Sequence, residues 1–228
     1  AQFFEQYSLV SAGVVDEHNR LIGRITADDI VWVLQEEAEE DILRLGGVTE
    51  SETNKSIVRS TQNRFVWLFV NLLTAILASY VISLFDASIE KMVALAILMP
   101  IVVSMGANAG TQTLTLTVRS LATKELVDTN RKRIFFREIL VSVLNGFIFA
   151  ILTAMTAYLW FSDGGLSIIV GAAMIINIFS AGLFGFLIPY ILYKIKIDPA
   201  LASSVFVTTI TDVFGFLSFL GLASIYLI

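Results

Sequence analysis

Apolar runs long enough to cross a membrane recur along most of this chain and constrain its fold more than any other feature. Five such runs occupy approximately residues 65–85, 90–118, 134–161, 166–193 and 199–228. An α-helix needs about 20 predominantly apolar residues to span the hydrocarbon core of a bilayer. Only 15% of the residues are charged and the mean hydropathy is +0.79, values far from those of soluble domains. The sequence therefore predicts an all-α polytopic membrane protein with five transmembrane helices.

The first 48 residues have a different pattern. The segment SAGVVDEHNRLIGRIT predicts two strands around a turn, and a helix follows from about Asp28 to the glycine pair Gly46 and Gly47. Two strands and a helix bury too little surface to fold alone, so we expect a small α/β fragment of a larger domain. The chain opens on AQFFEQYSLV, without a basic segment or cleavage site, so we expect no signal peptide.

Charge is distributed unevenly and predicts the topology. Acidic residues outnumber basic ones in residues 1–56, whereas basic residues are in excess afterwards. The basic residues concentrate in the loops between the second and third runs and between the fourth and fifth: Arg119, Lys124, Arg131, Lys132, Arg133, Arg137, Lys194 and Lys196. By the positive-inside rule these loops are cytoplasmic. We therefore expect a multi-pass protein of the cell membrane with a cytoplasmic amino terminus and an extracytoplasmic carboxyl terminus.

Asp212 is the only ionisable residue in the last apolar run, TTITDVFGFLSFLGLASIYLI. A carboxylate at the bilayer centre costs roughly 2.5–3.5 kcal/mol on insertion scales, so such a residue usually faces a cavity, a partner or an ion. Ser204, Thr208 and Asp212 are four residues apart and Gly215 follows three later, which places all four on one helix face. Hydroxyls, one fixed charge and a small residue suit a path for a hydrated cation. Alternatively, the hydroxyls bond back to their own helix and Asp212 pairs with a neighbouring polar group.

The second run contains MPIVVSMGANAGTQTLTLTVRS, which is unusually polar for a membrane helix. Gly106 and Gly110 form a pair that permits close helix approach. Helical spacing also groups four polar residues on one face: Ser104, Asn108, Gln112 and Thr115. Helix packing alone explains the glycines but not this polar face. Two polar stripes therefore predict a shared lumen, and a symmetric dimer would bring two Asp212 carboxylates around one axis.

Three asparagines lie within other runs, at Asn71, Asn145 and Asn177. We expect them to form hydrogen bonds between helices and consider a role as ion ligands less favoured.

Any bound metal must be held by oxygen, because the chain has no cysteine and only one histidine, His18. An acidic run, Glu36, Glu37, Glu39, Glu40 and Asp41, is a second candidate cation site, since hard divalent cations prefer carboxylates. The alternative is a solvated helix face. With a net charge of −5, we expect no nucleic-acid partner.

Four segments together resemble the MgtE family of magnesium channels and transporters: VVDEHNRLIGRITADDI, EEAEEDILRLGGV, MPIVVSMGANAGTQTLTLTVRSLA and IDPALASSVFVTTITDVFGFLSFLGLA. The resemblance implies a homodimer in the lipid bilayer, with a cation pore on the two-fold axis lined by the second and fifth helices. It implies that Asp212 is the selectivity carboxylate, holding Mg²⁺ largely through its water shell. The family's polar pore motif falls on Gly106, Asn108, Gly110 and Gln112.

The resemblance also divides the chain and assigns a regulatory site. Residues 1–48 resemble the carboxyl-terminal part of a CBS domain, residues 49–64 the family's plug helix, and residues 65–228 its transmembrane domain. Glu37, Glu40 and Asp41 match the acidic positions at which cytosolic Mg²⁺ regulates the pore. The amino-terminal domain and most of the CBS pair are missing, so we expect an incomplete gate.

We therefore expect a Mg²⁺ influx pathway gated by cytosolic Mg²⁺, and not an enzyme. One alternative is an ion-coupled divalent cation exporter, in which Asp212 would cycle between protonated and ionised forms. A less favoured alternative is an intramembrane aspartyl protease, which needs two carboxylates sharing a proton and hence two copies of this chain.

Overall fold

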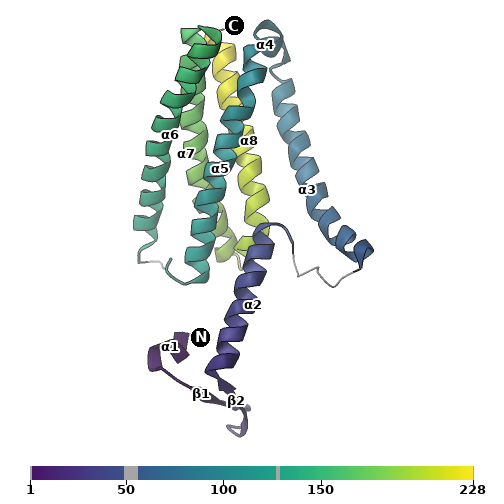
Figure 1. The fold of residues 1–228 in the computed structure, drawn as a ribbon, viewed down its shortest axis with the longest axis vertical. Coiled ribbons are helices and arrows are strands. Elements are labelled where there is room, and N and C mark those ends of the chain that lie inside the picture. Colours follow the sequence, from purple (N-terminus) through teal and green to yellow (C-terminus); the bar gives the residue numbers. More distant parts are fainter. Residues whose placement is uncertain (1, 49–55, 127–128, 228) are drawn as a thin grey trace. The chain divides into compact units, whose positions relative to one another are not determined.

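The structure, a computed structural model, describes residues 2–48, 56–126 and 129–227 (Figure 1). The chain divides into two compact units, Ala1–Asn63 and Arg64–Ile228, and each is described by itself. Helix α3, Ile57–Ser83, runs through the division without a break. Of the residues 49–64 expected to form the plug helix, residues 57–64 lie at the start of α3, and residues 49–55 lie outside the described part of the chain.

The first unit contains a hairpin and a long helix. After a short helix α1, Gln2–Tyr7, strands β1, Ser11–Val15, and β2, Leu21–Thr26, pair antiparallel with a register shift at Val14/Val15. The connecting turn is held by Asp16, whose Oδ1 accepts the backbone N–H groups of His18 and Arg20 at 2.8 Å. Asn19 takes the left-handed conformation in this turn (φ 58°), which asparagine tolerates well.

Helix α2, Ala27–Leu45, begins with a reciprocal cap. The Thr26 hydroxyl accepts the Asp29 backbone N–H, and the Asp29 carboxylate accepts the backbone N–H of Thr26 at 2.8 Å. This capping box satisfies two donors that a helix start otherwise leaves free. The predicted hairpin and helix are thus confirmed, with the helix beginning one residue before the expected Asp28.

Five helices of the described chain are long and apolar enough to cross a membrane, as the sequence predicted. They are α3; α5, Ala94–Ala122; α6, Arg131–Phe161; α7, Gly164–Lys194; and α8, Pro199–Tyr226, of which Ser203–Tyr226 forms the candidate span. A short helix α4, Asp86–Lys91, precedes α5, so the second span begins at Ala94 and not near Glu90. The chain is an all-α polytopic membrane protein with a small two-stranded sheet.

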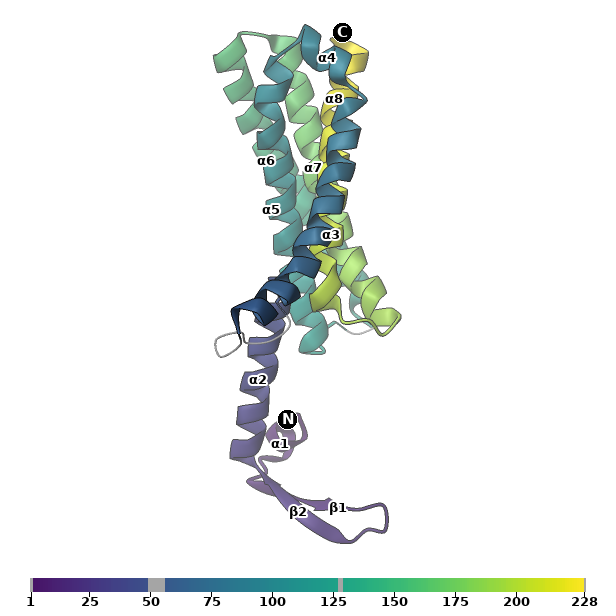
Figure 2. The same cartoon turned by 90° about the vertical axis from the view of Figure 1, so that its right-hand side faces the viewer.

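Helix α7 is the centre of the membrane unit, because α5, α6 and α8 all pack against it (Figure 2). Small residues make these contacts close. A Cβ placed on Gly171 would lie 3.2 Å from the Ala150 carbonyl oxygen of α6, and one on Gly185 would lie 3.0 Å from the Gly110 carbonyl oxygen of α5. Helix α7 has no polar face and carries much of the buried core, including Val170, Met174 and Ile178.

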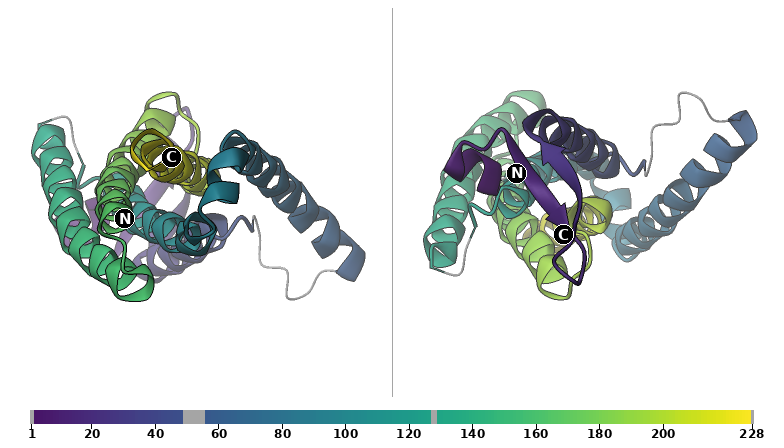
Figure 3. Two further views of the ribbon diagram at one scale, coloured as in Figure 1. Left: turned by 90° about the horizontal axis from the view of Figure 1, so that it is seen from above. Right: turned by 90° about the horizontal axis from the view of Figure 1, so that it is seen from below.

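Within the membrane unit, helix α3 stands apart from the other long helices and comes nearest to them at its carboxyl-terminal end, beside α4 (Figure 3). Of its residues, Ala78 and Val81 are buried, whereas Leu68, Leu72 and Ile76 are exposed. An apolar helix with so few neighbours in its own chain needs lipid or a second chain to cover it.

Candidate functional site

Helix α5 presents two distinct faces. The four polar residues that share helical spacing, Ser104, Asn108, Gln112 and Thr115, are all exposed on a single chain. Gly106 and Gly110 are buried and lie on the face that packs against α7 and α8. The structure thus brings Asn108 and Gln112 to an open face and places the two glycines of the same predicted motif inside the chain.

Helix α8 carries the predicted polar stripe, and its residues also differ in how deeply they are buried. Ser204, Thr208 and Asp212 are half-buried, whereas Gly215 is buried against α7. The Thr208 hydroxyl donates to the Ser204 carbonyl oxygen at 3.0 Å, which is the alternative of bonding back to its own helix. Asp198 begins the helix: its carboxylate accepts the Ala200 backbone N–H at 2.9 Å, and Pro199 occupies the first turn.

Asn177 of α7 links these two helices. Its side chain is 0% exposed, and its Nδ2 donates to the Val102 carbonyl oxygen of α5 at 2.8 Å. A Cβ on Gly106 would lie 2.1 Å from Nδ2, and one on Gly215 would lie 2.8 Å from the same atom. One amide therefore fills the space that glycines leave on both α5 and α8. The prediction of an interhelical hydrogen bond is confirmed for Asn177.

The contacts of α5 and α8 place Asn108 and Asp212 at one level of the bundle. Gly110 lies beside Thr211, since a Cβ on Gly110 would be 3.4 Å from Thr211 Cγ2. Gly106, four residues before Gly110 on α5, and Gly215, four residues after Thr211 on α8, both lie against Asn177. The two helices are therefore antiparallel, and Asn108 and Asp212 each lie between the same two contacts.

Asp212 has no partner within the described chain: no hydrogen bond or ion pair joins it to another described residue. Nor do the described residues contain any group of three or more His, Cys, Asp or Glu side chains that could hold a metal ion. Asp212 is thus a half-buried carboxylate on the stripe of α8, with the amide of Asn108 near its level and the hydroxyl of Thr208 one turn away. Such a set suits contacts to the water shell of an ion better than direct coordination.

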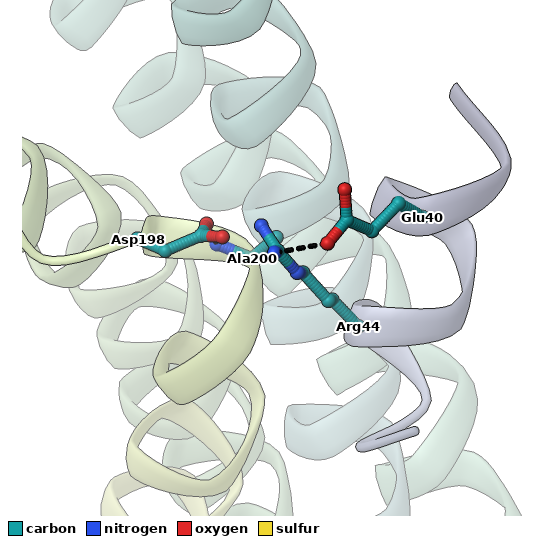
Figure 4. A network of polar contacts seen from close by, with 4 residues as sticks. All are labelled: Glu40, Arg44, Asp198 and Ala200. Carbon is teal, nitrogen blue, oxygen red and sulfur yellow. Dashed lines mark hydrogen bonds and ion pairs between the residues drawn. The ribbon is translucent and has the colours of Figure 1, made fainter. Parts of the chain in front are cut away.

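The acidic face of α2 carries the second candidate site. Glu37 is exposed, and Glu40 forms an ion pair with Arg44 one turn later (Figure 4). The side chain of Asp41 lies outside the described ones. Pairing at i and i+4 is typical of a helix surface, where such pairs contribute about 0.3–0.5 kcal/mol, and both members of this pair are half-buried.

Sequence reasoning missed a second buried acid, Glu138 of α6, which is 9% exposed. Glu138, Ser142, Gly146 and Ala150 recur every four residues, and all are buried on one face of α6. The spacing was available in the sequence and identifies the face of α6 that packs on α7.

Comparison with known proteins identifies the family. The family model of MgtE, a divalent cation transporter, matches residues 99–222, which is more than half of the chain. Proteins named magnesium transporter MgtE are 32% identical over 229 residues in Bacillus subtilis, 34% over 230 in Thermus thermophilus and 30% over 227 in Enterococcus faecalis. Each match covers 100% of this chain and 51%, 51% and 50% of the relative, so the chain spans about half the length of these curated relatives. The matched region contains or overlaps α5, α6, α7 and α8. This chain therefore belongs to the MgtE family of divalent cation transporters.

Proposed function

We propose that this chain forms a homodimeric pathway for Mg²⁺ influx, with a pore on the two-fold axis lined by α5 and α8. The three relatives are named as magnesium transporters, which supports Mg²⁺ as the transported ion. Its role is transport and not catalysis. Its location is the cell membrane, with the amino terminus in the cytoplasm and the carboxyl terminus outside.

The observation that carries this proposal is the half-buried Asp212, without a partner in the described chain and level with the exposed Asn108. An unpaired carboxylate at membrane depth is costly unless an ion, water or a second chain compensates it. In a two-fold dimer each Asp212 would face its symmetry mate, and the two charges would attract a divalent cation to the axis.

The neighbouring groups fit a cation that keeps its water. Mg²⁺ dehydrates reluctantly and is usually bound through one or two carboxylates together with several waters. The exposed amides of Asn108 and Gln112 on α5, and Ser204 on α8, offer oxygen atoms that accept hydrogen bonds from such a water shell. Gly106, Gly110 and Gly215 contribute differently, by letting these helices approach one another within the chain.

Cytosolic Mg²⁺ regulates this pathway through the acidic face of α2. Glu37 and Glu40, with Asp41 beyond the described side chains, concentrate negative charge that a divalent cation would neutralise. Arg44 already offsets part of the charge of Glu40, so a regulatory ion at this site competes with an existing ion pair. Residues 49–64, the proposed plug helix, connect this segment to the membrane unit.

The test is Mg²⁺ uptake into proteoliposomes by the wild type and by Asp212→Asn. We expect uptake to fall about tenfold or more in the variant, since each ~1.4 kcal/mol of lost ion stabilisation is a factor of ten. Asp86→Asn, which removes an exposed carboxylate from α4, is the matched control and retains wild-type uptake. Equal uptake by the wild type and Asp212→Asn would contradict the assignment of Asp212 to the pore.

An imposed proton gradient separates the proposed pathway from ion-coupled export. A passive pathway takes up Mg²⁺ at a rate that does not depend on the proton gradient. Uptake or efflux that requires the gradient would favour coupled exchange, with Asp212 carrying the proton. Cleavage of a membrane peptide in place of ion flux would favour the protease.

A further inference from the structure

We propose that Asn177 is a positioning residue that sets the register of α5 against α8 and so keeps Asn108 and Asp212 at one level of the ion path. This inference rests on the proposed function, since it assigns Asn177 a role in that same pathway.

The first observation that supports this role is that the Asn177 side chain contacts both α5 and α8, in each case at a glycine. The Asn177 amide donates to the backbone of α5 at Val102 and lies against Gly106. The same Nδ2 atom lies against Gly215 of α8. Glycine is required on both sides, because a Cβ at either position would lie closer than 3.0 Å to the amide.

The second support is the hydrogen-bonding state of the amide. Asn177 is 0% exposed, yet its Oδ1 accepts no hydrogen bond from the described residues. A buried, half-satisfied amide lowers stability relative to an apolar side chain of similar size. Its presence therefore favours a role in specificity, in the way that a buried asparagine fixes the register of a coiled coil at a cost in stability.

Neighbouring residues explain how a single contact defines the register of α8. One turn away from Gly215 lie Thr211 and Phe219, both buried and both bearing side chains. Sliding α8 by a turn would bring one of them into the space that the Asn177 amide occupies. On α5, the hydrogen bond from Asn177 to the Val102 carbonyl oxygen fixes the height of the helix relative to the same amide. Asn108 lies within one turn of Gly106, and Asp212 lies within one turn of Gly215, so their relative height follows from the contacts of these glycines with Asn177.

The experiment compares Asn177→Leu with Asn145→Leu in proteoliposomes of the full chain. Asn145 is an asparagine on the exposed face of α6 and serves as the matched control. Three quantities are measured for each protein: the melting temperature, the maximum rate of Mg²⁺ uptake and the half-saturating Mg²⁺ concentration. A merely structural defect lowers the amount of active protein and hence the maximum rate, but leaves the half-saturating concentration unchanged.

We expect Asn177→Leu to melt at or above the wild-type temperature while its half-saturating Mg²⁺ concentration rises about tenfold, which corresponds to ~1.4 kcal/mol. Asn145→Leu keeps the wild-type value. An unchanged half-saturating concentration in a folded Asn177→Leu protein, or an equal rise in Asn145→Leu, overturns the proposal.

A second pair of variants decides the question if leucine prevents folding. Asn177→Ala leaves a cavity at Gly106, and adding Gly106→Ala refills it with a methyl group. The double variant is expected to recover melting temperature over Asn177→Ala but to keep the raised half-saturating concentration, because the hydrogen bond to Val102 is still missing. Recovery of both quantities would mean that Asn177 acts only by packing, which overturns the proposal.

Asp212→Asn in the same assay separates the two failures. If the wild type takes up no Mg²⁺, or Asp212→Asn behaves like the wild type, the proposed function fails and the register role falls with it. If Asp212→Asn lowers uptake about tenfold or more and Asn177→Leu leaves the half-saturating concentration unchanged, the proposed function stands and the register role alone is overturned.

Discussion

Gly110 of α5 lies directly against Val207 of α8, so that a methyl group at Gly110 would be 2.7 Å from Val207 Cγ1. Val207 is fully buried, and its branched side chain has little rotational freedom. The separation of the two helices that carry Asn108 and Asp212 is therefore set by a contact that has no room for one additional carbon atom.

Gly110→Ala is expected to lower the free energy of unfolding by about 1–3 kcal/mol, the usual cost of overpacking a well-packed core. Mg²⁺ uptake falls with it, because the helices must move apart at the level of Asp212. Thermal unfolding in detergent and uptake into liposomes measure the two effects. Adding Val207→Ala, which removes the obstructing methyl groups, should restore part of both, and no recovery in the double variant would contradict this contact.

The contact between α6 and α7 gives a second packing prediction. A Cβ on Gly182 would lie 1.9 Å from Ser142 Oγ and 2.6 Å from its Cβ. Gly182→Ala should therefore destabilise the bundle by about 1–3 kcal/mol, measured by thermal unfolding. Gly164→Ala is the control: a Cβ there meets nothing within 4 Å, so its melting temperature should stay at the wild-type value. Equal melting temperatures for the two variants would show that the α6–α7 contact is looser than described.

The capping box of α2 predicts a pH dependence outside the membrane. The backbone N–H of Thr26 and then its hydroxyl donate to Asp29, and these bonds hold the pKa of that carboxyl below its ordinary value of 3.8. A lowered folded-state pKa means that the stabilisation is complete above the ordinary value and is lost as the pH falls through the lowered one. The carboxyl carbon resonance of Asp29 should titrate below the usual range, and Thr26→Val should move its midpoint upward. A midpoint that Thr26→Val leaves unchanged would exclude the hydroxyl as a cause.

The acidic face of α2 predicts how regulation by Mg²⁺ responds to charge removal. If Glu37 and Glu40 hold a regulatory ion, raising Mg²⁺ on the side that carries residues 1–48 suppresses uptake by the wild type. The double variant Glu37→Gln with Glu40→Gln should need a higher Mg²⁺ concentration for the same suppression. Glu17→Gln, an exposed acid in the hairpin turn, is the control and should respond like the wild type. An unchanged response in the double variant would make this face an ordinary solvated surface.

Local patterns predicted much of the fold. The five apolar runs became five long helices, and the hairpin turn appeared at the DEHN segment where its residues predicted it. These features depend on short-range chemistry, namely hydrophobic length and hairpin pairing. Each can be recognised within a window of a few residues, so a single sequence is sufficient.

The orientation of each helix face was harder to predict, because it depends on which neighbours a helix meets. Asn177 forms the interhelical hydrogen bond expected of it, whereas Asn71 donates to the Trp67 carbonyl oxygen of its own helix and Asn145 is exposed. Residues two apart on a helix point to nearly opposite sides, so Gly106 and Asn108 cannot share one face. Helical spacing showed that each set of residues lay together, and only the packed bundle showed that the glycines face inward.

The proposed site at Asp212 is most directly tested by locating the ion. Crystals of the chain grown with Mn²⁺, an oxygen-preferring stand-in for Mg²⁺, would be measured for anomalous scattering. The proposal predicts a peak on a two-fold axis between two Asp212 carboxylates, at the level of Asn108, that disappears in Asp212→Asn. Manganese bound only elsewhere, with the same peaks in Asp212→Asn, would contradict the assignment of Asp212 as the charge that holds the transported ion.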